Sequence, residues 1–267
     1  MHSSISPLGA HLEDLWQAVE PLLPGFTVEL LRSVDSTNSE LMRRARAGAI
    51  EPVLLAADTQ TAGRGRMGKG WHSQAGQSLT FSLALPLSPA HWSGLSLAVG
   101  VSLAESLHPE VRLKWPNDLW LLGRKLGGVL VETAHQGESG QQPRMVVIGV
   151  GINIARPEAA AVAAASGAPP PVPPAGLAEI CMGQTAGETL AAVLPALVRD
   201  VLRFEAEGFA AFSQRFQARD ALQGRAVTLS DGSQGRADGV DATGALRVQT
   251  DAGCRVVSSA EVSVRPC

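Results

Sequence analysis

The hydrophobic pattern of this chain changes near residue 222, and that change limits the folds open to it. Before this point, apolar segments with helical spacing alternate with short apolar runs typical of strands. From Gly224 onward, short segments rich in Val, Leu and Thr are separated by Asp-Gly, Thr-Gly and Ala-Gly turns. This second pattern predicts a small antiparallel barrel of about five strands. We therefore expect two units, residues 1–222 and residues 223–267.

Helices and strands are predicted to alternate along the larger unit. The predicted helices are residues 8–20, 39–47, 91–107, 185–207 and 209–219. The predicted strands are residues 53–57, 78–85, 111–114, 119–122, 125–133 and 145–152, with a turn at Gly123-Arg124. Thr185 and Glu188 form a capping box at the start of the fourth helix, and Pro195 predicts a kink within it. The Ala- and Pro-rich run 159–175 is expected to be a surface loop or tether.

Charge and composition exclude several classes of protein. The formal net charge of -3 and the pI near 6.1 leave no global positive field to hold nucleic acid. The three cysteines are widely spaced and include no Cys-x-x-Cys pair, which argues against a disulfide framework or a zinc knuckle. No basic N-terminal segment with an apolar run follows the first methionine, and no stretch of about 18 uncharged apolar residues occurs. We expect a soluble, cytoplasmic protein that binds neither nucleic acid nor membrane.

The segment from Gly63 to Trp71 holds four glycines, three cations and a tryptophan. Glycines let backbone N–H groups approach phosphate oxygens, while Arg64, Arg66 and Lys69 supply charge-assisted hydrogen bonds to an anion. The Trp71 indole is suited to stacking on an adenine or an apolar ring. A solvated basic loop would have the same composition, but so much charge beside so many glycines favours a loop that orders over a ligand.

Two generic nucleotide motifs overlap this segment and fail in context. Residues 63–68 match Gly-x-Gly-x-x-Gly, but Gly70, Trp71 and Gly76 prevent the helix that a dinucleotide site needs next. Residues 63–69 match Gly-x-x-x-x-Gly-Lys, but Gly70 stands where a P-loop needs a Ser or Thr hydroxyl. Neither a Rossmann dehydrogenase nor a P-loop ATPase is predicted.

A second chemical segment, Lys114 to Asp118, follows a predicted strand. A proline-fixed turn there would aim polar side chains outward from the sheet edge, although the same residues suit a purely structural turn. Lys125 lies beyond a hairpin turn, so we expect it to return to the neighbourhood of Asp118. The only three lysines of the chain are Lys69, Lys114 and Lys125, all in these segments. For residues 149–153, strand packing and close approach to a ligand stay open.

Five motifs occur in the order of the signature series of biotin protein ligases, which this chain resembles. They are Ser36-Thr37-Asn38, Gln60-Thr61-Ala62-Gly63-Arg64-Gly65-Arg66, Lys114-Trp115-Pro116-Asn117-Asp118, Lys125-Leu126-Gly127-Gly128 and Gly149-Val150-Gly151-Ile152-Asn153. The resemblance covers residues 30–155, and the part from Gly224 onward resembles the family by pattern only. It implies an α+β fold: a mixed sheet with helices, similar to class II aminoacyl-tRNA synthetases, and a small C-terminal SH3-like β-barrel.

The resemblance also implies an ATP-dependent, AMP-forming, C–N bond-forming enzyme. Biotin and MgATP would give biotinyl-5′-AMP, and a lysine of a biotin carboxyl carrier domain would then take the biotinyl group. ATP and Mg²⁺ are the implied cofactors, biotin is the substrate, and a biotin-dependent carboxylase carries the acceptor. The family frequently dimerises through sheet edges, so a homodimer is a possible assembly.

Site residues follow position by position from the matching motifs. Lys125, Arg66 and Asp118 are the implied catalytic residues, and Asp118 is also the candidate ligand of Mg²⁺. The implied biotin contacts are Ser36, Thr37, Asn38, Gln60, Gly63, Arg64, Gly65, Arg66, Lys125 and Gly128. The implied nucleotide contacts are Arg64, Arg66, Trp71, Lys114, Asn117 and Asn153.

The sequence departs from the family pattern in the basic loop and leaves two rival functions open. Met67 stands where a basic residue is common, and Lys69 replaces an arginine. Only 35 residues precede Ser36, so a monofunctional ligase without a DNA-binding domain is expected. One rival is a lipoate or octanoyl protein ligase, which lacks the basic loop and the barrel. The other is a non-catalytic biotinyl-AMP sensor, against which Lys125 and Asp118 count.

Overall fold

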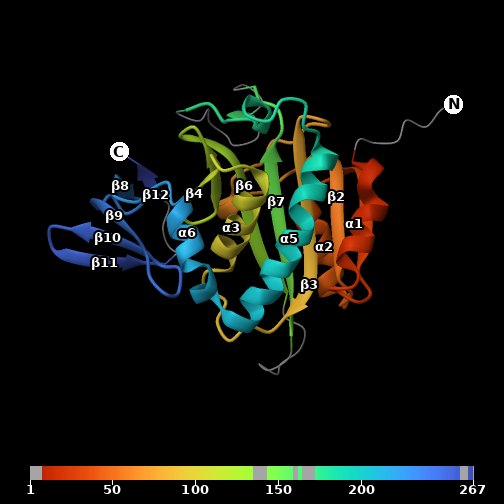
Figure 1. The fold of residues 1–267 in the computed structure, drawn as a ribbon, viewed down its shortest axis with the longest axis horizontal. Coiled ribbons are helices and arrows are strands. Elements are labelled where there is room, and N and C mark those ends of the chain that lie inside the picture. Colours follow the sequence, from red (N-terminus) through yellow and green to blue (C-terminus); the bar gives the residue numbers. More distant parts are fainter. Residues whose placement is uncertain (1–7, 135–142, 159–161, 164–171, 259–263, 267) are drawn as a thin grey trace.

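The computed structural model describes residues 8–134, 143–158, 162–163, 172–258 and 264–266. A seven-stranded sheet with helices on both faces is followed by a small five-stranded sheet at one end of the molecule (Figure 1). The strand order of the large sheet is β1-β2-β3-β7-β6-β5-β4. Only β1 and β2 are parallel, and every other neighbouring pair is antiparallel. The mixed sheet is thus confirmed.

The elements of the larger unit have the following bounds. Its strands are β1 (Thr27–Val34), β2 (Val53–Gln60), β3 (Ser78–Leu87), β4 (Arg112–Lys114), β5 (Asp118–Leu121), β6 (Arg124–Ala134) and β7 (Arg144–Asn153). Its α-helices are α1 (Leu12–Val19), α2 (Thr37–Arg46), α3 (Leu95–Leu107), α5 (Ala186–Glu207) and α6 (Ser213–Arg219). Short 3-10 turns are η1 (Gly9–His11), η2 (Arg66–Gly68), η3 (Leu177–Glu179) and η4 (Phe209–Phe212).

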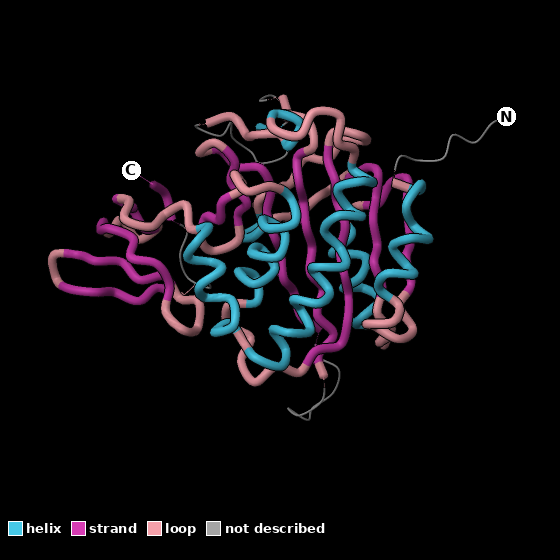
Figure 2. The backbone as a smooth tube through the Cα atoms, in the orientation of Figure 1, coloured by secondary structure: helices cyan, strands magenta, loops and turns pink. Residues whose placement is uncertain are grey.

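The two faces of the large sheet are covered differently. Helices α1, α3 and α5 lie on one face, where the main hydrophobic core is, and α2 lies on the other (Figures 1 and 2). Successive side chains of a strand point to opposite faces. On β3, Leu79, Phe81 and Leu83 belong to the main core, while Thr80 and Ser82 face the side of α2. The α2 face therefore has polar and small side chains on which a site can be built.

Most predicted helices and strands are present, with shifted ends. Helix α2 begins at Thr37 rather than at residue 39, because the Ser36 side chain accepts a hydrogen bond from the Ser39 N–H and caps the helix. Helix α3 begins at Leu95 rather than at residue 91, following Gly94, which has a left-handed φ of 86°. The predicted capping box at the start of α5 is confirmed. The last predicted helix, 209–219, is split into η4 and α6.

One strand was missed, and two predictions about the chain path need correction. Strand β1 was not predicted, because at the edge of the sheet its exposure shows no alternation. The turn between β5 and β6 is centred on Leu122 and Gly123, both with positive φ, so it lies one residue earlier than predicted. The end of the predicted surface run is buried: Ala175 donates its N–H to the Lys125 carbonyl and accepts from the Asn153 side chain. Most of the rest of that run lies outside the described residues.

The C-terminal sheet is antiparallel throughout, in the order β11-β10-β9-β8-β12. Its strands are β8 (Ala226–Leu229), β9 (Gln234–Val240), β10 (Leu246–Thr250), β11 (Gly253–Val257) and β12 (Val264–Pro266). The five predicted strands are thus confirmed. Of the helices among the described residues, none has the length and apolar character to cross a membrane.

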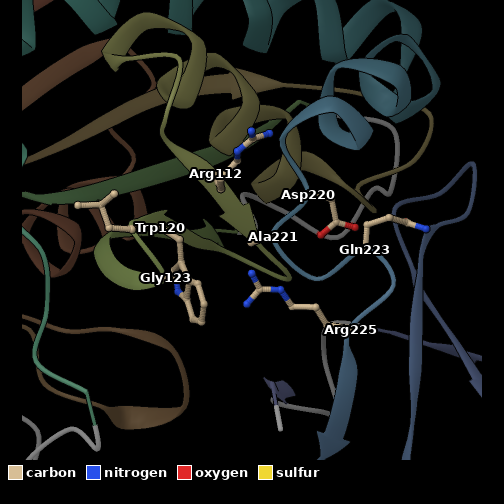
Figure 3. A pocket seen from close by; sticks show the side chains of 8 residues that line it. Arg112, Trp120, Gly123, Asp220, Ala221, Gln223 and Arg225 are labelled. Carbon is tan, nitrogen blue, oxygen red and sulfur yellow. The ribbon is translucent and has the colours of Figure 1, made fainter. Parts of the chain in front are cut away.

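A cavity of about 320 Å³ lies between strands β4 and β5 and the segment 220–225 that precedes β8 (Figure 3). Arg225 extends from the start of β8 toward the Trp120 indole, and the Asp220 carboxyl faces the same space. Oxygen Oδ1 of Asp220 accepts from the Leu222 N–H at 2.8 Å, whereas Oδ2 is buried without a hydrogen bond to any described residue. Burial raises the pKa of Asp220 to about 6, although backbone N–H groups oppose the rise.

Replacing Asp220 by Asn is expected to stabilise the protein in a pH-dependent way. Well below pH 4 the carboxyl is protonated in both the folded and the unfolded chain. Between about pH 4 and pH 6 the unfolded chain releases this proton while the folded protein keeps it, so the wild type loses about 1–3 kcal/mol of unfolding free energy, and the loss is complete above pH 6. Urea unfolding should therefore show Asp220→Asn more stable at pH 8 and nearly unchanged at pH 3.5. An equal gain at both pH values would contradict the ionisation argument.

Candidate active site

One row of residues, in register across six strands, forms the floor of the site on the α2 face. From β2 to β4 the row is Ala57, Thr80, Gly151, Gly128, Asp118 and Lys114. Side chains directly opposite each other on neighbouring strands point to the same face. Small residues fill the middle of the row, and its end at β5 and β4 is ionic. A ligand on this face would lie beside small residues and would meet charge at one end of the row.

Ser36, Thr37 and Asn38 approach the sheet from the first turn of α2. Asn38 lies over Ser82 and Gly149, which are paired on β3 and β7, and its Oδ1 is 2.7 Å from the Ser82 hydroxyl. Thr37 donates both its N–H and its hydroxyl to the Gln60 side-chain oxygen, at 2.8 and 3.1 Å. All three side chains of the motif are buried. The structure thus brings the Ser-Thr-Asn motif and Gln60 together.

Gly149 is expected to be required for the position of Asn38. A Cβ at residue 149 would overlap Oδ1 of Asn38 and lie 3.2 Å from its Nδ2. Forcing such a shift costs about 1–3 kcal/mol, so Gly149→Ala should weaken the binding of biotin, the substrate that the family resemblance implies, about tenfold to a hundredfold. Isothermal titration with biotin measures the affinity, and thermal unfolding separates a local loss from a folding defect. A folded variant with unchanged affinity would place Asn38 outside the biotin site.

The glycine-rich segment Gly63 to Trp71 doubles back on itself. Trp71 N–H donates to the Gly63 carbonyl at 2.8 Å, and Gly65 N–H donates to the Lys69 carbonyl at 2.6 Å. Met67 adopts a left-handed φ of 55° at the tip, where its side chain is 69% exposed. The returning arm brings the Trp71 indole onto β7.

Gly151 is the position on β7 that accommodates this indole. A Cβ at residue 151 would lie 2.5 Å from the Trp71 ring, so only glycine leaves room for it. Trp71 therefore covers the middle of the floor row, and its Nε1 is buried without a hydrogen bond to a described residue. The contact with Trp71 explains why residue 151 is a glycine, and the contact with Asn38 explains why residue 149 is a glycine.

The three lysines of the chain converge on Asp118 at the ionic end of the row. Lys125 Nζ is 2.7 Å from Asp118 Oδ1, and Lys114 Nζ is 3.7 Å from Oδ2. Burial acts to raise the pKa of Asp118, but Lys125 and Lys114, helped by Lys69, outweigh it and hold that pKa below its ordinary value. Burial also lowers the pKa of Lys114, which Asp118 offsets in part. The surplus of ammonium groups over one carboxylate makes this end a place for an anion.

A β-bulge turns Lys125 toward the site. Gly128 pairs with Asp118, but the register shifts at Leu119/Trp120 so that Trp120 pairs with Lys125. Lys125 is three residues from Gly128 and would point to the opposite face in a regular strand. The expected approach of Lys125 to Asp118 is confirmed, and the bulge is its structural cause.

The remaining motif residues donate hydrogen bonds to backbone carbonyl groups and so hold neighbouring segments of the chain together. Asn117 donates its side-chain N–H to the Val129 carbonyl at 2.7 Å, and its Oδ1 lies 3.4 Å from Arg66 Nη1. Asn153 is buried and donates to the Ala175 carbonyl, so it ties β7 to the segment before η3. Trp115, which precedes the cis bond to Pro116, is fully buried and donates to the Gly244 carbonyl at 3.0 Å. These contacts hold the Lys114 to Asp118 turn in place.

Sequence reasoning missed three polar residues of the site. Glu132 on β6 accepts from both Arg64 and Asn38. Ser82 lies within 2.7 Å of the Thr37 and Asn38 side chains, and the Ser73 hydroxyl accepts from the Gln60 N–H. Polar residues at positions 78, 80 and 82 alternate with apolar ones in the first half of β3, and this alternation was a signal for Ser82. No neighbour of Glu132 in the sequence indicated a role in the site, because it is strand pairing that brings Glu132 to the loop.

Comparison with known proteins agrees with this geometry. The sequence profile of the Biotin/lipoate A/B protein ligase family matches residues 30–153, and that of the Biotin protein ligase C terminal domain matches residues 223–265. The Escherichia coli bifunctional ligase/repressor BirA is 36% identical over 259 residues, which cover 91% of this chain and 75% of that protein. The acetyl-CoA-carboxylase biotin ligase of Paracoccus denitrificans is 34% identical over 247 residues, covering 87% and 98%.

A solved structure gives the same answer for the fold. The biotin protein ligase from Aquifex aeolicus in complex with biotin and ATP aligns with a TM-score of 0.72 at 28% identity, covering 90% of this chain and 99% of that one. Its length is therefore matched almost in full. With five signature motifs gathered on one face of the sheet, and relatives matched over most of their length, the chain belongs to the biotin protein ligase family.

Proposed function

We propose that this protein is an ATP-dependent biotin protein ligase. It forms biotinyl-5′-AMP from biotin and MgATP and transfers the biotinyl group to a lysine of a carrier domain. The proposal rests on how the polar groups are arranged in the site. The Ser36 to Asn38 motif lies at one end of a floor of small residues, and three lysines surround Asp118 at the other end. This order of groups suits a molecule with a polar ring, an acyl link and a phosphate.

In the first step, a biotin carboxylate oxygen attacks the α-phosphorus of ATP and pyrophosphate leaves. Negative charge grows on the α-phosphoryl oxygens, and Lys125 is placed to meet it, because Asp118 holds the ammonium group at 2.7 Å. Lys114 and Arg66 add positive charge at the same end. We assign adenylate contacts to Arg64, Arg66, Trp71, Lys114, Asn117 and Asn153.

At the other end, the ureido ring of biotin offers both N–H donors and a carbonyl acceptor. We assign its contacts to Ser36, Thr37, Asn38 and Gln60, whose hydroxyl and amide groups complement it. Gly63, Arg64, Gly65, Arg66, Lys125 and Gly128 complete the assigned biotin contacts. A Cβ at residue 128 would touch Lys125 Nζ at 3.5 Å and Asp118 Oδ1 at 3.6 Å, so glycine leaves the floor open beside this ion pair.

In the second step, the carrier lysine attacks the acyl carbon of biotinyl-AMP, an amide forms, and AMP leaves with the electron pair. Water competes for this carbon, so the adenylate needs cover. Trp71 over Gly151 and the basic loop above the site supply that cover.

Mg²⁺ enters this site as part of MgATP, where it neutralises phosphate charge. Among the residues that the structure describes, no cluster of three His, Cys, Asp or Glu side chains forms a metal cage. Asp118 is a single carboxylate already paired with two lysines. Mg²⁺ is often held by one carboxylate plus phosphates, but two ammonium groups beside that carboxylate oppose a second cation. Asp118 as a metal ligand stays a prediction that requires a lysine to move.

The acceptor is the biotin carboxyl carrier domain of a biotin-dependent carboxylase, in keeping with the acetyl-CoA-carboxylase ligase name of relatives. We place the domain boundary between residues 222 and 223. Ala221 donates its N–H to Leu113 of β4, whereas Gly224 donates to Ala237 of β9, so the backbone changes sheets there. We further propose a cytoplasmic enzyme that can form a homodimer through a sheet edge and does not bind nucleic acid.

A transfer assay tests the proposed function. Purified protein, biotin, MgATP and a biotin carboxyl carrier domain should give one biotinyl group on one carrier lysine, read by mass spectrometry. A carrier with that lysine replaced by arginine should stay unmodified. Persistent failure to biotinylate any carrier, with folded protein, would overturn the proposal in favour of the sensor function.

A further inference from the structure

The carboxylate of Glu132 joins the basic loop to the Ser-Thr-Asn motif. Its Oε2 accepts a hydrogen bond from Arg64 Nη2 at 2.7 Å and from Asn38 Nδ2 at 2.9 Å. Arg64 belongs to the loop and Asn38 to helix α2, whereas Glu132 lies on β6. One oxygen therefore connects three separate elements of the chain.

The connection continues through a chain of hydrogen bonds to the far end of the loop. Asn38 Oδ1 is 2.7 Å from the Ser82 hydroxyl, which is also 2.7 Å from the Thr37 hydroxyl. Thr37 donates to Gln60, whose own N–H donates to the Ser73 hydroxyl at 2.9 Å. Arg64 lies near the start of the Gly63 to Trp71 loop, and Ser73 lies just after its end. Both ends of the loop are thus tied to the same motif.

Glu132 binds Arg64, whereas the other two cations of the loop act at the opposite end of the site. The side chain of Arg64 is 46% exposed and that of Glu132 is 25% exposed, so water screens their attraction and its contribution to folding is small. A charge-assisted hydrogen bond still fixes the direction of the Arg64 guanidinium. Arg66 and Lys69, by contrast, act on Asp118 at the other end of the site.

We propose that Glu132 is a positioning residue that latches the Gly63 to Trp71 loop, through Arg64, to the Asn38 amide. Occupation of the Asn38 end by biotin and closure of the loop are then coupled through one carboxylate oxygen. This inference deepens the proposed ligase function and assigns Glu132 no contact with the reacting atoms.

The test uses Glu132→Gln, which keeps an oxygen for the Asn38 amide and removes the charge that holds Arg64. KM for biotin should rise about tenfold and biotinyl-AMP should dissociate several-fold faster, while kcat at saturating biotin changes less than about threefold. Arg64→Met should raise KM at least as much, because it also removes the ligand contacts assigned to Arg64, and adding Glu132→Gln to Arg64→Met should cause no further loss. Glu105→Gln is the matched control, because it breaks a surface pair with Arg215 far from the loop.

A second readout does not need activity. Trypsin cuts after Arg64, Arg66 and Lys69 when the loop opens, so Glu132→Gln should speed loop cleavage several-fold relative to wild type and to Glu105→Gln. An unchanged cleavage rate, an unchanged KM, or additive effects in the double variant would overturn the latch. Because the cleavage comparison works without biotin, it still tests the latch if the wild type fails to biotinylate a carrier.

Discussion

Replacing Lys125 by Ala should slow formation of biotinyl-AMP at least about a hundredfold, while biotin binding falls much less. The ammonium group of Lys125 lies 2.7 Å from Asp118 at the ionic end of the floor row, where the proposed mechanism places the charge that develops on the α-phosphate. Removing one preorganised charge from such a position typically costs about 3–4 kcal/mol of transition-state stabilisation. Single-turnover mixing with labelled ATP measures the first step, and calorimetry measures biotin affinity.

Two further variants make this result specific. Lys125→Arg keeps the charge but replaces a compact ammonium by a planar guanidinium. Partial recovery of the rate of the first step would show that this step needs both the positive charge and the shape of the ammonium group. Arg203→Ala removes a cation from an exposed pair on α5 and should leave the rate unchanged. A first step within about threefold of wild type in Lys125→Ala would remove Lys125 from catalysis.

Replacing Arg66 by Gly should loosen the grip on biotinyl-AMP and cause labelling of amines on bystander proteins. Arg66 is half-buried, lies 3.4 Å from the Asn117 Oδ1, and is attracted by Asp118. Losing a shielded charge-assisted contact costs about 1.5–3 kcal/mol, which corresponds to release about ten to a hundred times faster. Gel filtration of the preformed complex gives the release rate, and albumin serves as the bystander protein.

Glycine also adds backbone freedom, so a second variant separates the two effects. Arg66→Met keeps a long side chain and removes only the charge. Equal loss of retention in both variants assigns the effect to charge, whereas loss in the glycine variant alone assigns it to loop stiffness. Unchanged retention and unchanged carrier specificity in both would rule out the proposed role of Arg66.

Local signals were enough to predict the motifs and most of the elements that hold them. The capping box at Thr185, the hairpin after Asp118 and the turns of the C-terminal sheet each depend on residues a few positions apart. Such short-range chemistry can be read without knowing which strands pair. The approach of Lys125 to Asp118 was predictable for the same reason.

What could not be predicted depends on strand pairing. The floor row joins Thr80, Gly151 and Gly128, whose alignment is set by the order β3-β7-β6 and not by neighbours in sequence. That order also brings Glu132 to Arg64 and makes the two glycines of the 149–153 motif necessary for Asn38 and Trp71. Strand β1 was missed because an edge strand lacks the alternation that marks a half-buried one.

Biotin-dependent exchange of labelled pyrophosphate into ATP tests the central claim most directly, because only an enzyme that activates a carboxylic acid as its adenylate catalyses it. The assay needs purified protein and Mg²⁺, with biotin, lipoate or octanoate as the acid. We predict exchange with biotin alone, and its loss in Lys125→Ala. Exchange only with lipoate or octanoate would assign the chain to those substrates, and no exchange with any acid in folded protein would contradict the ligase mechanism.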